Sequence, residues 1–170
     1  MKVVSNAGPL IAFGKLNRLD LLVAMYERLM IPIEVHREIR FGVWMGYGRS
    51  LDISALIESG SIRVLAVDPV QVAFERPINL GEVGAIRLAL QEKAALVLID
   101  DRDARIEAAR LGLRVKGTVG VIIAAIAQNL ISASEAIRLL ETIRQRSDIW
   151  VGAKVVQAAI DEIRKRSSVG

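Results

Sequence analysis

Short aliphatic segments alternate with longer helical patterns along the whole chain, and this alternation limits the possible folds more than any other feature. The clearest segment is Leu96–Ile99, four consecutive branched apolar residues. Such a run is typical of a parallel strand that is covered on both faces. Strands that alternate with helices of about ten residues indicate βαβ units. We therefore expect an α/β fold, a three-layer sandwich with a mainly parallel central sheet.

The same patterns give the expected element positions. Strands are predicted at 3–4, 29–31, 62–67, 96–99 and 114–115. Helices are predicted at 10–16, 33–39, 51–58, 81–93, 101–111, 118–129, 133–146 and 153–166, and a further one begins at a cap on Asn17. Residues 1–131 would form the α/β domain. Residues 132–170 would be a C-terminal helical extension, packed on the same domain or on a partner.

Composition removes several classes of protein. The chain contains no cysteine and one histidine, His36, which excludes a disulfide scaffold, a thiolate metal site and a multi-histidine zinc site. The longest apolar run, Val119–Ala127, is too short to cross a membrane and predicts a buried helix. Without a recognisable signal peptide, we expect a cytoplasmic protein with no membrane partner.

Segment Phe41–Ser50 combines three glycines with three large aromatic rings. The glycines predict a mobile loop. Two alternatives remain open for the rings, a clamp for nucleobases or a docking point for a partner chain.

Polar and acidic side chains follow the expected strands, at the edge where open parallel sheets place their sites. They are Asn6, Glu38, Glu82, Asp100, Asp101 and Asp103. Carboxylates that meet in one pocket repel each other unless a cation lies among them. Ligands that are all oxygen favour Mg²⁺ or Mn²⁺, and such an ion can activate water to cut a phosphodiester.

A structural alternative exists for several of these acids. Glu82, Asp101 and Asp103 each stand at an expected helix start, where a negative charge is favourable through the helix dipole alone. The adjacent pair of Asp100 and Asp101 is harder to explain in this way, because two neighbouring carboxylates repel each other without helping the fold.

Five motifs of the chain lie at these strand and helix ends: 3–11, 31–38, 80–86, 98–105 and 111–118. Together they resemble the PIN-like domains of a prokaryotic subfamily related to the toxin nucleases of toxin–antitoxin pairs (VapC-like). The resemblance covers residues 3 to about 131, so residues 1–131 would be a PIN-like nuclease domain. It implies the fold expected above and an Mg²⁺- or Mn²⁺-dependent endoribonuclease.

The resemblance also implies roles for individual residues. Glu38, Glu82 and Asp101 match the second, third and fourth metal-binding acids of the family, and Asp103 matches an additional acid. Asp100 is the neighbour of the fourth acid, and we place it with Glu38, Glu82 and Asp101 in the catalytic set. The first acid is normally an aspartate, and here Asn6 stands in its place.

Partners follow from the same resemblance. We expect an RNA substrate, an antitoxin protein and a homodimer. Arg102 and Arg105 flank the acids, where they would bind the RNA phosphates or, alternatively, form salt bridges to Glu107 or a neighbouring acid. An apolar stripe on 155–163 could form the dimer interface or pack within the protomer. Because a neutral amide replaces one ligand charge, a catalytically weak or inactive RNA-binding module is the first alternative. A structural homodimer, in which the acids only cap helices, is the second.

Overall fold

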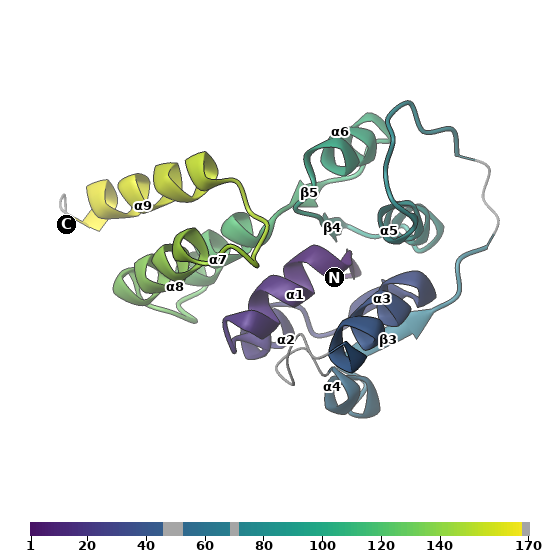
Figure 1. The fold of residues 1–170 in the computed structure, drawn as a ribbon, viewed down its shortest axis with the longest axis horizontal. Helices are drawn as coiled ribbons and strands as arrows, with labels where there is room; N and C mark the ends of the chain where they lie inside the picture. Colours follow the sequence, from purple (N-terminus) through teal and green to yellow (C-terminus); the bar gives the residue numbers. More distant parts are fainter. Residues whose placement is uncertain (46–52, 69–71, 168–170) are drawn as a thin grey trace.

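A five-stranded parallel sheet forms the centre of the protein (Figure 1). The computed structural model describes residues 1–45, 53–68 and 72–167. The strands are β1 (Val3–Ser5), β2 (Leu29–Pro32), β3 (Ile62–Leu65), β4 (Leu96–Leu98) and β5 (Val115–Lys116). Their order is β3-β2-β1-β4-β5, and every pair is parallel. The expected α/β class and parallel sheet are confirmed.

Alternate residues of the strands face two separate apolar layers. Val3 of β1 lies in a core with α1 (Ala7–Lys15), α2 (Leu19–Met25) and α7 (Thr118–Ala127). Val4, the next residue, lies in a second core with α5 (Leu80–Gln91) and α6 (Arg102–Arg110). The period of two that any strand imposes on its side chains therefore gives the three-layer sandwich.

Two further helices lie beside β2 and β3. They are α3 (Ile33–Trp44), which follows β2 directly, and α4 (Ser54–Glu58), which precedes β3. Val35 and Ile39 bury the inner face of α3 in the first core. This packing positions α3 against α1 and α5.

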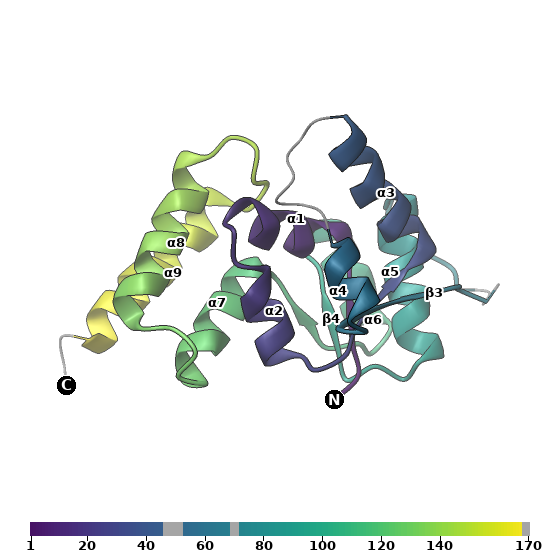
Figure 2. The same ribbon diagram turned by 90° about the horizontal axis from the view of Figure 1, so that it is seen from below.

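The C-terminal helices pack on the same core as the sheet. α8 (Ala133–Gln145) and α9 (Ala153–Ser167) lie side by side next to α7 (Figure 2). The side chain of Ser132 caps α8 by accepting a hydrogen bond from the backbone N–H of Glu135, as expected. Most of the apolar stripe on α9 is buried within the protomer, at Val156, Ala159, Ile160 and Ile163. The stripe is therefore no free dimer surface.

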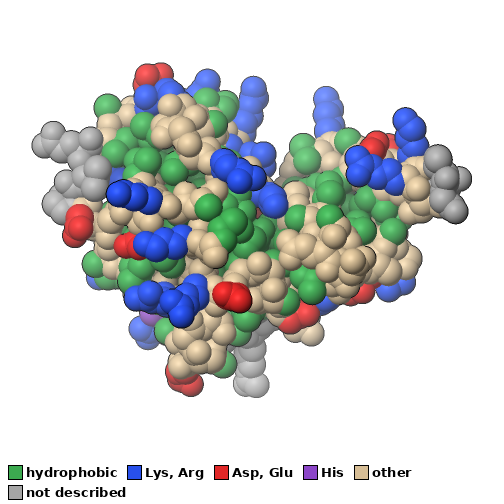
Figure 3. All heavy atoms as spheres, turned by 180° about the vertical axis from the view of Figure 1, so that it is seen from behind, with side chains coloured by type: hydrophobic (Ala, Val, Ile, Leu, Met, Phe, Trp, Pro, Cys, Tyr) green, Lys and Arg blue, Asp and Glu red, His purple; other side chains and the backbone are tan. Residues whose placement is uncertain are grey.

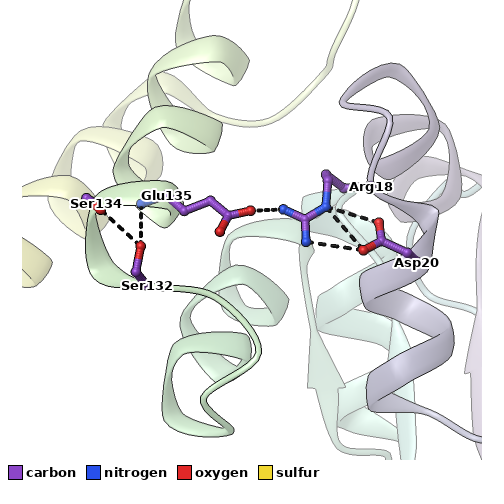
Figure 4. A network of polar contacts seen from close by, with 5 residues as sticks. All are labelled: Arg18, Asp20, Ser132, Ser134 and Glu135. Atoms are coloured by element: carbon purple, nitrogen blue, oxygen red, sulfur yellow. Dashed lines mark hydrogen bonds and ion pairs between the residues drawn. The ribbon is translucent and has the colours of Figure 1, made fainter.

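A polar network joins α8 to the start of α2 (Figure 4). Arg18 forms ion pairs with Asp20 of α2 and with Glu135 of α8. The guanidinium gains two anionic partners, which raise its pKa. These contacts add to the apolar packing that fixes the position of the C-terminal helices.

The structure corrects two local expectations. Phe41–Trp44 belongs to α3, and the helix continues through Gly42 despite a propensity cost of about 1 kcal/mol for glycine. The rest of the expected loop, residues 46–50, lies outside the described residues. Asn17 does not cap α2. It has a left-handed backbone with φ of 55°, and Arg18 is the first boundary residue of that helix.

Candidate functional site

A cavity of about 440 Å³ opens at the carboxyl ends of the strands. The chain passes from β1 to β2 and β3 on one side of the sheet, and β4 and β5 lie on the other side of β1. This reversal between β1 and β4 is where open parallel sheets bind ligands. The polar part of the cavity wall consists of Asn6, Lys15, Glu38, Asn79, Glu82, Asp100, Asp101 and Asp148.

Asn6 and Glu38 converge at Gly81 in the first turn of α5. A methyl group placed on Gly81 would lie 2.9 Å from Oε2 of Glu38 and 3.3 Å from Oδ1 of Asn6. The absence of a side chain there leaves room for both oxygens. Oδ1 of Asn6 is buried and has no hydrogen-bond partner among the described residues. A buried acceptor without a donor is costly, so this oxygen has the character of a ligand atom.

Glu82 is held in place by a capping box at the start of α5. The side chain of Asn79 accepts a hydrogen bond of 2.9 Å from the backbone N–H of Glu82, and Oε2 of Glu82 accepts one of 2.8 Å from that of Asn79. The reciprocal bonds fix the carboxylate in the cavity wall. Glu82 is only 6% exposed, which is unusual for an acid that forms no ion pair within the described residues.

The electrostatics of Glu82 and Glu38 indicate a local excess of negative charge. Burial raises the pKa of Glu82, and the charges of Asp101 and Glu38 raise it further, against the opposing hydrogen bond from Asn79. Partial desolvation in the cavity wall also raises the pKa of Glu38, although the residue is more exposed than Glu82. Both groups would be stabilised in their charged form by a cation in the cavity.

Asp100 connects the end of β4 to the start of α7. Its two oxygens accept hydrogen bonds from Thr118, at 2.7 Å from the backbone N–H and 2.6 Å from the hydroxyl. Burial raises the pKa of Asp100, while these bonds and the charge of Arg105 act in the opposite direction. Asp100 thus lines the cavity and also secures the first residue of α7.

Asp101 is the N-cap of α6. Its Oδ1 accepts a hydrogen bond of 2.9 Å from the backbone N–H of Ala104, and its side chain reaches the cavity. The capping role foreseen as an alternative is therefore present together with a position in the acidic site. One carboxylate can serve both purposes, since it has two oxygens and about four acceptor positions.

Three residues expected at the site lie outside the cavity wall. Asp103 forms an ion pair of 2.8 Å with Arg76. Arg102 is exposed in the first turn of α6. Arg105 lies near Gly117, where its Nη1 atom would be 2.6 Å from an added methyl group, beside Oδ1 of Asp100.

The donor set fits a hard divalent cation with mixed ligands. No group of three or more Asp, Glu or His side chains that could hold a metal occurs within residues 1–45, 53–68 and 72–167. A cation in the cavity would therefore have to take the unpartnered oxygen of Asn6 together with one or two carboxylates and water. Mg²⁺ normally keeps several waters and takes one or two carboxylates, so this combination is sufficient.

Three components of the cavity have no counterpart among the expected site residues. Asn79 stands three residues before Glu82, and this Asn-x-x-Glu spacing is a capping signal that could have been found. Lys15 ends α1, and its side chain is only 12% exposed. Residues 148–151, between α8 and α9, form the wall that includes Trp150. No sequence pattern indicates the position of that wall.

Comparisons with known proteins agree with this architecture. A family model described as PIN domain matches residues 2–165, a range that includes α8 and most of α9. Among solved structures, a PilT N-terminus domain protein from the archaeon Sulfolobus solfataricus P2 has a similar fold. The TM-score is 0.53 and the identity 21%, over 74% of this chain and 94% of that chain. No curated protein sequence matches significantly. None of the described helices is long and apolar enough to span a membrane.

Proposed function

This chain belongs to the PIN domain family, and on that premise we propose that it is a metal-dependent ribonuclease that hydrolyses phosphodiester bonds of RNA. Members of this family are generally nucleases that use divalent metal ions. The observation that carries the proposal is the cavity in which a buried, unpartnered oxygen of Asn6 meets carboxylates with raised pKa values. A cation would stabilise such a group of oxygens.

The proposed ligands are the amide oxygen of Asn6 and one or two of the carboxylates of Glu38, Glu82 and Asp101, completed by water, and the ion is Mg²⁺ or Mn²⁺. The ion would supply activation of water and stabilisation of the charge that develops on the phosphate. Asn79 would orient Glu82 through the capping box, and Asp100 would hold α7 against the site through Thr118. Asp103 is left out of the ligand set because Arg76 occupies it.

Basic residues near the cavity would bind the RNA backbone. Arg105 lies beside Asp100, and Arg102 is exposed one turn away on α6. Lys and Arg side chains are also spread among apolar ones over the face shown in Figure 3. The chain carries a net charge of +4, so an acidic pocket in a basic surface attracts both the cation and the phosphates.

Cleavage of labelled single-stranded RNA in Mn²⁺ or Mg²⁺ tests the proposal. Asp101→Asn removes one proposed ligand charge, and Asp103→Asn is a matched control on the same helix turn outside the cavity. We expect wild type and Asp103→Asn to cleave at similar rates, with Asp101→Asn at least about tenfold slower. Equal rates for wild type and Asp101→Asn would contradict the proposal, as would cleavage that persists in EDTA.

A second candidate function follows from Asn6. An amide in place of the first acid makes the site less negative by one charge, which weakens metal binding. The protein would then be an RNA-binding or regulatory module with little turnover. In that case wild type binds RNA without cutting it. A large gain of cleavage in Asn6→Asp would identify the native site as weakened by the missing charge.

The resemblance to toxin nucleases supports a narrower role, the toxin of a toxin–antitoxin pair with an antitoxin protein as partner. A toxin arrests growth when it is produced without its antitoxin. We expect wild type to arrest growth of a bacterial host and Asp101→Asn to leave growth normal at equal protein levels. Arrest by both proteins would show that the effect does not depend on the site. A homodimer remains a separate proposal, which sedimentation of the purified chain tests.

A further inference from the structure

A short segment between α8 and α9 forms one wall of the acidic cavity. We call residues 146–151 the strap, and its members that line the cavity are Asp148, Ile149, Trp150 and Val151. The opposite wall carries the acids of the proposed metal site. A substrate that fills this cavity would therefore contact both the acids and the strap.

The strap is fixed to the C-terminal end of α1 by polar contacts. Arg146 donates two hydrogen bonds of 2.8 Å to the two oxygens of Asp148 and another, of 3.1 Å, to the backbone oxygen of Lys15. Lys15 in turn donates to the backbone oxygen of Asp148 and lies 3.3 Å from its carboxylate. These contacts lower the pKa of Asp148 well below its usual range. A bidentate arginine pair orders the residues beside it.

Two neighbouring side chains of the strap differ sharply in burial. Ile149 is only 6% exposed and lies in the first core, which anchors the segment. Trp150 is 89% exposed, although it lines the cavity. An anchored segment that presents a large, unpartnered aromatic ring beside a polar site has the properties of a stacking surface.

We propose that Trp150 stacks on an unpaired nucleobase next to the phosphodiester held at the acidic cavity. This rests on the proposed ribonuclease function and narrows its substrate to single-stranded or looped RNA, since bases inside a duplex offer no free face. The Arg146–Asp148 pair holds the backbone beside the ring, so binding costs little backbone conformational entropy. Stacking of one base on an aromatic ring is sequence-tolerant, so Trp150 selects unpaired structure instead of sequence.

Binding of a short oligoribonucleotide in the presence of Ca²⁺ tests the proposal, with RNA integrity followed on gels. Trp150→Leu keeps an apolar side chain and removes the ring, and Trp150→Phe restores a ring. Trp44→Leu is the matched control, because Trp44 is 78% exposed and does not line this cavity. We expect Trp150→Leu to raise Kd about tenfold, while Trp150→Phe and Trp44→Leu stay within about threefold of wild type.

Fluorescence gives a second, independent readout. The chain has two tryptophans, so in Trp44→Phe protein all tryptophan emission comes from Trp150. Single-stranded RNA should quench this emission, and the same RNA in a duplex should not. Unchanged affinity of Trp150→Leu, or unchanged emission at saturating RNA, would overturn the proposal. So would a loss of binding in Trp44→Leu alone.

These experiments distinguish failure of the stacking proposal from failure of the ribonuclease proposal. If RNA binds through Trp150 but wild type does not cleave in Mn²⁺, the ribonuclease proposal fails and the stacking surface stands. If wild type cleaves and Trp150→Leu binds and cleaves equally well, the stacking surface fails alone. If no RNA binds under any condition, both are overturned.

Discussion

Glu82→Gln should make the metal-free protein more stable while it weakens metal binding. The substitution keeps the shape of the side chain and the capping box, because a glutamine oxygen also accepts the hydrogen bond from the backbone N–H of Asn79. It removes the charge of a carboxylate that is 6% exposed. Stability and function therefore change in opposite directions, which no purely structural role for Glu82 predicts.

The expected change in the free energy of unfolding is a balance of opposing contributions at the Glu82 carboxylate. Loss of charge weakens the bond to Asn79 by about 1 kcal/mol and removes a helix-dipole interaction of about 0.5 kcal/mol. Against this, the variant escapes a desolvation cost of several kcal/mol for a buried ion and the repulsion from Asp101 and Glu38. The raised pKa shows that the unfavourable contributions exceed the favourable ones. We expect a net gain of about 1 kcal/mol, or about 3 °C in Tm.

The raised pKa of Glu82 also determines how the stability difference between wild type and Glu82→Gln changes with pH. The folded state raises the pKa of Glu82 above 4.5, so it holds the proton more tightly than the unfolded state does. The stability contributed by this group is therefore fully present below 4.5 and is lost as pH rises through the folded pKa. Wild type and Glu82→Gln should have similar stability in mild acid, and the variant should gain its advantage above that range.

Urea unfolding in EDTA and in Mn²⁺ measures both effects. Mn²⁺ should stabilise wild type in proportion to its affinity and should stabilise Glu82→Gln much less. The reasoning is refuted if Glu82→Gln is less stable than wild type in EDTA at neutral pH. Equal stabilisation of both proteins by Mn²⁺ would refute the assignment of Glu82 as a ligand.

Three further substitutions have distinct expected results. Asn6→Asp should lower metal-free stability by about 1 kcal/mol and raise Mn²⁺ affinity at least about tenfold, measured by calorimetry. Gly81→Ala places a methyl group 2.9 Å from the Glu38 carboxylate, so Mn²⁺ affinity should fall while Tm is maintained. Thr118→Val leaves Asp100 with one donor fewer and should cost about 1–3 kcal/mol in urea unfolding.

Each of these has a clear contrary outcome. Unchanged Mn²⁺ affinity in Asn6→Asp would place the first ligand elsewhere. A fall in Tm without a fall in Mn²⁺ affinity for Gly81→Ala would show that the glycine serves packing alone. A cost below about 0.5 kcal/mol for Thr118→Val would mean that Asp100 does not depend on its hydroxyl donor.

The fold was predictable because its signals are local. The run Leu96–Ile99 has no polar position, which predicts a strand covered on both faces, and Leu96–Leu98 forms β4 between two helical layers. Asn6 directly follows β1 and Asp101 immediately precedes α6. Their location at the carboxyl edge of the sheet was therefore also predictable from the order of the elements along the chain. The extension of α3 to Trp44 runs against the local preference of glycine at position 42, and the sequence pattern does not indicate it.

The composition of the cavity was less predictable because it depends on long-range packing. Trp150 comes from the C-terminal part of the chain, and its place beside Asn6 is set by how α8 and α9 pack on α7 and how Arg146 contacts Lys15. Asp103 has the sequence position of a ligand, yet the rotation of a helix turns it toward Arg76. Sequence spacing therefore identifies candidate site residues, while the direction of each side chain decides which of them line the same cavity.

The location of a bound divalent cation tests the central claim most directly. Crystals of the protein grown or soaked with Mn²⁺ would show the ion through its anomalous scattering. The account predicts one site in the cavity, with Oδ1 of Asn6 and carboxylate oxygens of Glu38, Glu82 or Asp101 at about 2.2 Å. An empty cavity at millimolar Mn²⁺, or an ion bound only at exposed acids such as Asp103, would contradict it.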